Sequence, residues 1–352
     1  MAYDSGDLRR AADTLAAHLS GAGPTEGIAR VAVLHPVDVV HPADRTAKEH
    51  LEALPLLQTL IKAYLKMTAE RVDRFVNVNG GVRLGTGQFP DVYQLLPPIC
   101  AAFGIAEPEL FLSGVESNAS TMGSTYITIA VGGELLDRLD EDEMRAILAH
   151  ECGHIVADHV LYHSMAIHLA KGSLAGLLRW GGPVGSVAAM ATGPLEAALM
   201  AWSRASELTA DRAAVVYLGG AEPLVRGLLK IAGVPAGRVG SVDLDLLVAQ
   251  AAEYDPLNRS MWDRLLQSGV MRGVSHPMLA VRVREALAWA ASADCQRVQQ
   301  AIRGEAALLC TTCRAPLDPT WRFCLRCGVA VPAQSPRPEL ESRPELESTT
   351  DV

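Results

Sequence analysis

Two histidines and a glutamate near the middle of the chain have the residue types and the spacing of a zinc hydrolase site. The stretch AHECGHIVADH (149–159) contains the pattern H-E-x-x-H, with His150, Glu151 and His154. On a helix, histidines four residues apart lie on one face, where both imidazoles can bind one zinc ion. Glu151 can then accept a proton from the attacking water. The alternative is an amphipathic helix that carries these histidines by chance.

A site of this kind needs a third protein ligand, with one coordination position left open for water. Glu207, in SRASELTAD, is the best candidate, 53 residues after His154. Asp211 lies four residues further along the same helical face, where it could hold a ligand histidine by its free ring N–H. The alternative for these two acids is a solvated acidic face.

Four of the seven cysteines predict a second metal site. They follow the pattern C-x2-C-x10-C-x2-C: Cys310, Cys313, Cys324 and Cys327. Four thiolates close the tetrahedral sphere of a zinc ion and leave no position for water, so we expect a structural zinc ribbon. Metal binding would supply the folding energy that so short a segment lacks. A redox role is the alternative, because a single C-x-x-C can be redox-active. We expect two zinc ions, one catalytic and one structural.

Composition limits the partners and the compartment. The 352 residues carry a net charge of -9, which disfavours binding to nucleic acid or to an anionic membrane. Basic residues and Trp321 in the ribbon could still contact nucleic acid, but we expect the ribbon to dock a protein partner. The first residues lack the apolar core of a secretory signal, so we expect a cytoplasmic protein. A membrane-associated location is the alternative, through peripheral contact of 172–202.

The elements that must position these residues are mainly helices. A capping box at Asp140 and Glu143 predicts that one long helix begins there and carries the histidines through to residue 163. Further helices are expected over 195–218, which carries both acids, and over 275–291, capped by Ser275. Other predicted helices cover 1–22, 44–68 and 91–103, the last of which ends at Gly104. The runs 109–115 and 125–131 predict neighbouring strands, and the second alternates in polarity.

The predicted fold class is therefore α+β and mainly helical, with a domain that carries the candidate zinc-hydrolase residues, a small β-sheet and a zinc-ribbon module. The expected domains are an N-terminal helical extension (1–40), the metallopeptidase domain (41–303), the zinc ribbon (304–331) and a disordered tail (332–352) with a tandem RPELES.

Over much of 41–290, the chain resembles the HtpX and CAAX-prenyl-endopeptidase group of zinc metallopeptidases. The resemblance is carried by four blocks in the order of that family: PELFLSGVESNAS, LLDRLDEDEMRAILAHECGH, SRASELTAD and SHPMLAVR. It implies a gluzincin-type metalloprotease domain in which His150, His154 and Glu207 bind zinc. It also implies that Glu151 is the general base and that Asp211 supports a ligand.

The last block implies that His276 faces the site and stabilises the oxyanion, with Arg282 as a structural or charge partner. The alternative for His276 is a structural role at a helix start. An edge strand within 118–131 is expected to pair with the substrate backbone. For His159, His163 and His168 we expect structural or supporting roles and no metal binding, because their spacings do not repeat that of the ligand pair. Cys152 is expected to be buried and to face away from the metal.

These observations predict a zinc-dependent endopeptidase that hydrolyses peptide bonds of protein substrates. The alternative is an inactive or latent adaptor with the protease fold, which recruits a protein partner through its zinc ribbon.

Overall fold

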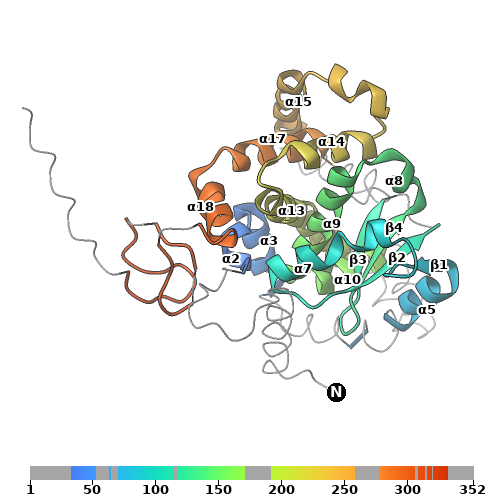
Figure 1. Ribbon diagram of the computed structural model, residues 1–352, viewed down its shortest axis with the longest axis horizontal. Coiled ribbons are helices and arrows are strands. Elements are labelled where there is room, and N and C mark those ends of the chain that lie inside the picture. The colour runs from blue at the N-terminus through green and yellow to red at the C-terminus, as the bar shows by residue number, and fades with distance from the viewer. Residues whose placement is uncertain are drawn as a thin grey trace, which may run out of the picture.

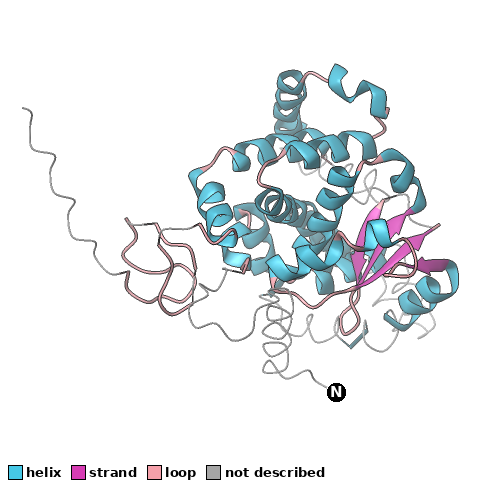
Figure 2. Cartoon of the chain, in the orientation of Figure 1, coloured by secondary structure: helices cyan, strands magenta, loops and turns pink. Residues whose placement is uncertain are grey.

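The computed structural model describes residues 33–52, 63–64, 70–114, 118–170, 192–257, 278–305, 308–313, 315–318 and 320–331. Helices make up most of this part of the chain, and the strands gather on one side of it (Figure 2). The predicted mainly helical α+β class with a small sheet is therefore confirmed. The predicted helix over 1–22, the segment 171–191, Ser275, His276 and the RPELES tail lie outside the described residues.

The helices are α2 (Pro36–Val39), α3 (Pro42–Glu52), α5 (Glu70–Gly80), α6 (Pro90–Tyr93), α7 (Leu96–Phe103), α8 (Gly133–Arg138), α9 (Glu141–Val156), α10 (Val160–Ala170), α13 (Thr192–Leu218), α14 (Glu222–Ile231), α15 (Leu244–Leu257), α17 (Leu279–Ala290) and α18 (Ala293–Ile302). A 3-10 helix, η2, covers Ala236–Ser241. The strands are β1 (Gly81–Arg83), β2 (Glu109–Ser113), β3 (Ala119–Met122) and β4 (Thr128–Gly132).

Helices α9 and α13 lie at the centre of the molecule, and the other helices surround them (Figure 1). They approach closely at Gly153, where an added Cβ would lie 3.0 Å from the Cα and the carbonyl oxygen of Ala210. Only glycine allows this separation without a shift of one helix, and closer helix packing brings the side chains of the two helices together. Residues of both helices, such as Leu148 and Val215, belong to the main hydrophobic core.

Helix α9 begins as predicted but is shorter than predicted. The Asp140 side chain accepts from the Glu143 backbone N–H at 3.0 Å, and the Glu143 carboxylate accepts from the Asp140 N–H at 2.9 Å. The single helix expected to reach residue 163 instead ends at Val156, and α10 begins at Val160. Asp158, between them, has φ +56°, a left-handed conformation that ends a helix. Glycine usually occupies such a position, so the sequence does not signal this break.

The four strands form one mixed sheet in the order β1-β2-β4-β3. The predicted pairing of two neighbouring strands is confirmed, with β2 parallel to β4. The short strands β1 and β3 were not predicted, and both pair antiparallel to their neighbours. All five residues of β4 are buried, so both faces of this strand are covered and its alternating sequence does not mark a solvent face. Strand β3 ends the order and lies against α9 and α10.

The turn after β3 is fixed by contacts from two helices. Gly123 has φ +125°, and a Cβ there would lie 2.0 Å from the carbonyl oxygen of Tyr126, so this turn requires glycine. The Glu70 carboxylate accepts from the backbone N–H groups of Thr125 and Tyr126 at 2.6 and 2.5 Å. The Ser164 hydroxyl accepts from the Gly123 N–H at 3.0 Å. These contacts hold β3 beside the histidines of α9.

Two other predicted helices differ from the expectation near their starts. The helix over 91–103 is divided into α6 and α7, because Pro97 and Pro98 occupy the first turn of α7 and disfavour a continuous helix before them. Gly104 closes α7 with φ +62°, as predicted. Helix α17 begins at Leu279 with Met278 as its N-cap, so a cap at Ser275 is not the start of this helix. Within the described ranges, no helix is long and apolar enough to cross a bilayer.

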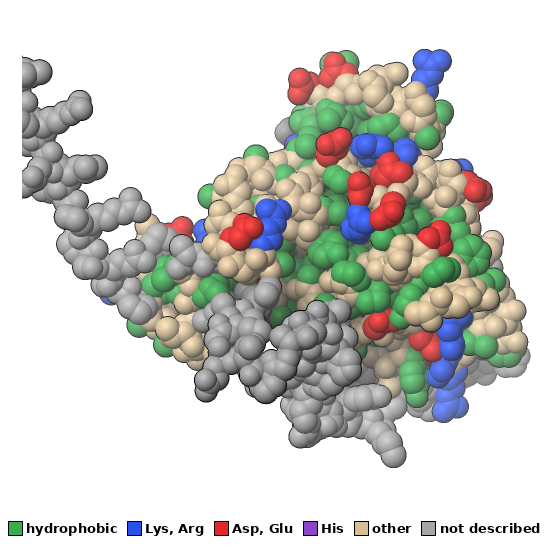
Figure 3. Space-filling view, viewed as in Figure 1, with side chains coloured by type: hydrophobic (Ala, Val, Ile, Leu, Met, Phe, Trp, Pro, Cys, Tyr) green, Lys and Arg blue, Asp and Glu red, His purple; other side chains and the backbone are tan. Residues whose placement is uncertain are grey.

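The cysteine module lies beside α18 and α2, at the side of the molecule away from the sheet (Figure 1). Its own core consists of Cys310, Ala315, Leu317 and Cys324. Arg326 donates to Asp38 at 2.5 Å, and the Arg297 guanidinium lies 4.7 Å from the centre of the Trp321 ring. On the face drawn in Figure 3, acidic and basic side chains interleave and form no broad field of one sign.

Candidate functional site

Helices α9 and α13 bring three predicted metal ligands together in the interior. Among the described residues, His150, His154 and Glu207 form one of two groups whose ligand atoms all lie within 4.8 Å of one another. Glu207 Oε2 is 3.4 Å from His150 Nε2, and Glu207 Oε1 is 3.4 Å from His154 Nε2. All three side chains are almost completely buried.

These separations fit a tetrahedral zinc ion. Zinc binds nitrogen and oxygen at about 2.0–2.2 Å, which places two tetrahedral ligand atoms about 3.3–3.6 Å apart. The two distances of 3.4 Å lie within that interval and are longer than a strong hydrogen bond between charged groups. Two imidazoles and one carboxylate are also the ligand set that leaves a coordination position for water.

His150 is held by a buried ion-pair network. Its Nδ1 lies 2.9 Å from Asp211 Oδ1, and the Arg282 guanidinium donates to both Asp211 oxygens, at 2.6 and 2.8 Å. Arg282 also reaches Glu207 Oε2 at 3.1 Å. Burial alone would raise the pKa of Asp211, but the charge of Arg282 and these hydrogen bonds hold it below its usual range. Asp211 therefore remains a carboxylate that accepts a hydrogen bond from Nδ1–H of His150.

His154 has different neighbours. Its Nδ1 faces Nδ1 of His159 at 3.1 Å, and the ring of His163 stacks on it with 4.8 Å between ring centres. Burial lowers the pKa of His154 to about 4, and the nearby Glu207 carboxylate opposes this only in part. Burial also acts to lower the pKa of His150, but there the bonds to Asp211 and Glu207 outweigh it and raise the pKa to about 9. The difference follows from Asp211, which contacts His150 directly, whereas Glu207 faces both imidazoles.

Glu151 lies between the two histidines and is held by the sheet. The Thr121 hydroxyl, on β3, donates to Glu151 Oε2 at 2.6 Å, and Glu151 is 1% exposed. One carboxylate oxygen of Glu151 is thus held by β3. No sequence pattern marks Thr121, because a lone threonine in an unpredicted strand belongs to no motif.

Among the described residues, the group of ligand atoms does not include His159, His163, His168 or Cys152. His163 Nε2 is 4.0 Å from Glu207 Oε1, and His168 Nε2 lies 2.9 Å from Asp73 Oδ2. Cys152 is fully buried in the main hydrophobic core. His276 is outside the described residues, so its predicted role as an oxyanion donor stays a prediction. Its expected partner Arg282 lies in the network around Asp211.

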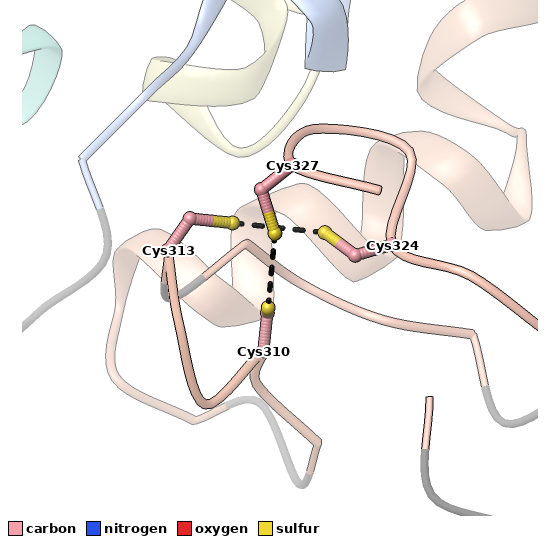
Figure 4. A group of neighbouring side chains, drawn as sticks. All are labelled: Cys310, Cys313, Cys324 and Cys327. Carbon is pink, nitrogen blue, oxygen red and sulfur yellow. Dashed lines mark hydrogen bonds between the residues drawn. The ribbon is translucent and has the colours of Figure 1, made fainter. Parts of the chain in front are cut away.

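The four cysteines form the second of the two groups. Cys310 Sγ lies 3.6 Å from Cys327 Sγ, and Cys313 Sγ lies 3.6 Å from Cys324 Sγ (Figure 4). A disulfide would need about 2.05 Å, whereas a tetrahedral zinc with bonds of about 2.3 Å separates its sulfurs by about 3.8 Å. The sulfur atoms point toward a common centre, as zinc ligands do.

Comparisons with known proteins agree with the geometry of the first group. The profile of peptidase family M48 matches residues 88–290, which is more than half of the chain. The chain belongs to peptidase family M48. The matched region contains both helices that carry the candidate ligands, and members of this family are metallopeptidases, so the chain is a protease.

The chain covers different shares of the relatives that it matches. It is 28% identical over 266 residues to plastoglobule-localized metallopeptidase 48 of Arabidopsis thaliana, and this covers 73% of each chain. It is 29% identical over 168 residues to an HtpX homolog of Ralstonia nicotianae, over 42% of this chain and 58% of that one. An HtpX homolog of a Sulfurihydrogenibium strain is 30% identical over 152 residues, 51% of its length. The chain thus spans little more than half of these HtpX homologs. No solved structure matches it significantly.

Proposed function

We propose that this member of family M48 is a zinc-dependent endopeptidase, in which His150, His154 and Glu207 hold the catalytic zinc and Glu151 is the general base. The observation that carries the proposal is the convergence of two imidazole nitrogens on one buried carboxylate at 3.4 Å, with Glu151 adjacent. A zinc ion bound there would polarise the scissile carbonyl and lower the pKa of a water to about 7.

The side chains divide the remaining work. Glu151 accepts the proton of the attacking water and delivers it to the leaving nitrogen, as a general base and then a general acid. The hydrogen bond from Thr121 fixes the Glu151 carboxylate, so that one orientation is set before substrate binds. Asp211 accepts a hydrogen bond from Nδ1–H of His150, which keeps the proton on Nδ1 and leaves the Nε2 lone pair for the metal. Arg282 balances the two buried carboxylates that it contacts.

The substrate is proposed to bind as an added strand along β3. This strand ends the sheet order, it carries Thr121, and its backbone runs beside the residue that performs the proton transfer. A peptide paired with such an edge would place a carbonyl near Glu151 through backbone hydrogen bonds alone. This accounts for general recognition of unfolded or extended protein segments. His276 is proposed as a second donor to the oxyanion.

For the cysteine module we propose a structural zinc ribbon that docks a protein partner, within the domain limits 41–303 and 304–331 given above. The 3.6 Å separations of its sulfur atoms support the zinc. We also propose a cytoplasmic location, with peripheral membrane contact through 172–202 as the alternative. No feature of the described residues favours the inactive adaptor, since the glutamate between the histidines is present and held in place.

The test compares the purified wild-type protein with Glu151→Gln, a variant of nearly identical shape. Both are incubated with an unfolded protein and a peptide library, and the products are identified by mass spectrometry. The wild type is expected to cut within chains, and Glu151→Gln is expected to keep its zinc and lose cleavage. Glu134→Gln, the same change at an exposed glutamate of α8, serves as a control that should cleave normally. Identical products from wild type and Glu151→Gln would refute the proposal.

A further inference from the structure

The second histidine of the group, His154, is connected to a distant carboxylate through another imidazole. His154 Nδ1 lies 3.1 Å from His159 Nδ1, and His159 Nε2 lies 2.9 Å from Oδ2 of Asp44, on α3. All three side chains are at most 1% exposed. A continuous row of hydrogen bonds therefore runs from the candidate metal position to an acid 115 residues away along the chain from His159.

Asp44 is held by donors on several sides. The Thr209 hydroxyl donates to its Oδ2 at 2.6 Å, and the Trp202 indole N–H donates to its Oδ1 at 3.0 Å. Both donors lie on α13, the helix that carries Glu207. Burial alone would raise the pKa of Asp44, but the bonds from His159 and Thr209 and the charge of Lys48 hold it below its usual range. Asp44 is thus a fixed anion that can only accept hydrogen bonds.

This anion determines where the protons of the row lie. Since Asp44 only accepts, Nε2 of His159 donates to it, and the row is completed when Nδ1 of that ring accepts from His154. His154 must donate from its own Nδ1, which leaves its Nε2 lone pair facing Glu207. We propose that Asp44 and His159 are positioning residues that fix His154 in the Nδ1–H tautomer required of a metal ligand. This inference rests on the function proposed above.

The break between α9 and α10 makes the contact possible. In a continuous helix, residues five apart point in directions about 140° apart and do not meet. Here the His159 N–H donates to the His154 carbonyl at 2.9 Å, and the Asp158 N–H donates to that of Ile155 at 3.1 Å. With Asp158 left-handed, these two bonds form a Schellman motif, which turns the chain back on the last helical turn. The turn brings the imidazole of His159 against that of His154.

The row also assigns a role to a segment before the family match. Asp44 lies in α3, ahead of residues 88–290, whereas the partner of the first histidine, Asp211, lies within them. The two ligand histidines are thus supported differently. His150 has a direct carboxylate from α13, and His154 has one reached through His159. The N-terminal segment supplies a part of the site that the matched region does not contain.

Asp44→Asn in the full chain is the decisive variant. The amide has one acceptor oxygen for the donors that now share two, and its NH2 group must face His159 or Trp202. If the NH2 group faces His159, Nε2 of that ring must accept, and its proton moves to Nδ1. His159 Nδ1 then donates to His154 Nδ1, so the His154 proton moves to Nε2. We expect zinc affinity at this site to fall about 10- to 100-fold, as for other partners of ligand histidines. Glu49→Gln, an exposed acid on the same helix, is the matched control and should leave affinity unchanged.

Two measurements report the effect independently of cleavage. Cobalt(II) distinguishes the sites, because thiolate ligands give it an intense charge-transfer absorption that imidazole and carboxylate ligands do not. Titration against a chelator then gives the affinity of the first site with the ribbon as an internal reference. Histidine 15N chemical shifts in the metal-free protein report the tautomer of His154 directly. His159→Phe, which keeps a ring against Trp202, is the second variant and tests the row if Asp44→Asn does not fold.

The inference is supported if Asp44→Asn and His159→Phe each lower the zinc affinity of the first site and leave that of the ribbon unchanged. The double variant should lose no more affinity than the more affected single variant, as for residues of one network. It is overturned if both variants fold, bind zinc as the wild type does, and leave His154 as the Nδ1–H tautomer. A wild type that itself binds no zinc through His150, His154 and Glu207 would instead show that the proposed function has failed. The two failures are therefore distinguishable.

Discussion

The two candidate metal centres differ in what holds their ligands in place. His150, His154 and Glu207 lie in the interior, where the close packing of two long helices and a set of buried hydrogen bonds fix each side chain. The four cysteines lie in loops whose hydrophobic core, within the described residues, is a cluster of four, two of which are themselves cysteines. The first centre is built by the fold, whereas the second has little besides its ligands to build it.

This difference separates metal binding for catalysis from metal binding for folding. A preformed site can keep a coordination position open, because the protein and not the metal maintains the geometry. A site whose metal holds the chain together must close its sphere with protein ligands. Removing metal should therefore leave the first centre folded and should disorder the second.

Glu207→Ala should have the largest effect, the loss of peptide cleavage. The zinc content is expected to fall from two ions per chain to one, because the two imidazoles alone hold the metal weakly. The far-ultraviolet circular dichroism should be retained, since α9 and α13 still pack at Gly153. Metal analysis and cobalt spectra of the variant check this result. A variant that kept both ions, or lost the thiolate-bound one, would contradict the assignment.

Changing two ribbon cysteines together, Cys324→Ser and Cys327→Ser, should have the opposite outcome. The thiolate-bound zinc is lost and the ribbon unfolds, because the four-residue core cannot replace the metal. Most of the cleavage of an unfolded substrate is expected to remain. Hydrogen exchange resolved along the chain would locate the change, with increased exchange over 308–331 and protection retained in α9. Equal loss of protection in both regions would show that the two centres fold as one unit.

Gly153→Ala should have the smallest effect and sharpens the contrast within the first centre. The added methyl would meet Ala210 at 3.0 Å, and separating α9 from α13 is expected to cost about 1–3 kcal/mol of unfolding free energy. Zinc affinity should fall at the first centre only, because its ligands lie on both helices. Gly227→Ala on α14, where an added Cβ finds only ordinary contacts, is the control. Urea denaturation and chelator titration of both variants give the comparison.

The sequence predicted the parts of the site that follow from short-range periodicity. The spacing of His150 and His154, the capping box that begins their helix, and the pair Glu207 and Asp211 all depend on residues three or four apart. Periodicity of this kind holds for any helix, so these side chains could be assigned to common faces before the structure was known. The neighbouring strands β2 and β4 were found because both lie in short runs of β-prone residues.

The parts that were missed depend on pairing across long stretches of chain. Thr121 and Asp44 reach the site through contacts with residues 30 and 115 positions away, and neither belongs to a recurring motif. The break at Asp158 lacks the glycine that usually marks a left-handed cap, so the histidine helix was predicted to be too long. His159 consequently had no predicted partner, since its contact with His154 exists only because the helix ends between them.

The N-terminal segment that contains α2 and α3 has a practical consequence for work on fragments of this protein. Asp38 accepts from Arg326 of the ribbon, and Asp44, six residues later, accepts from His159 beside the first centre. A recombinant fragment cut at the limits of the family match, residues 88–290, would omit both acids and the ribbon itself. Failure of such a fragment to cleave would say nothing about Glu151. Fragments intended to report on catalysis should begin no later than Val33, the first residue of the described segment.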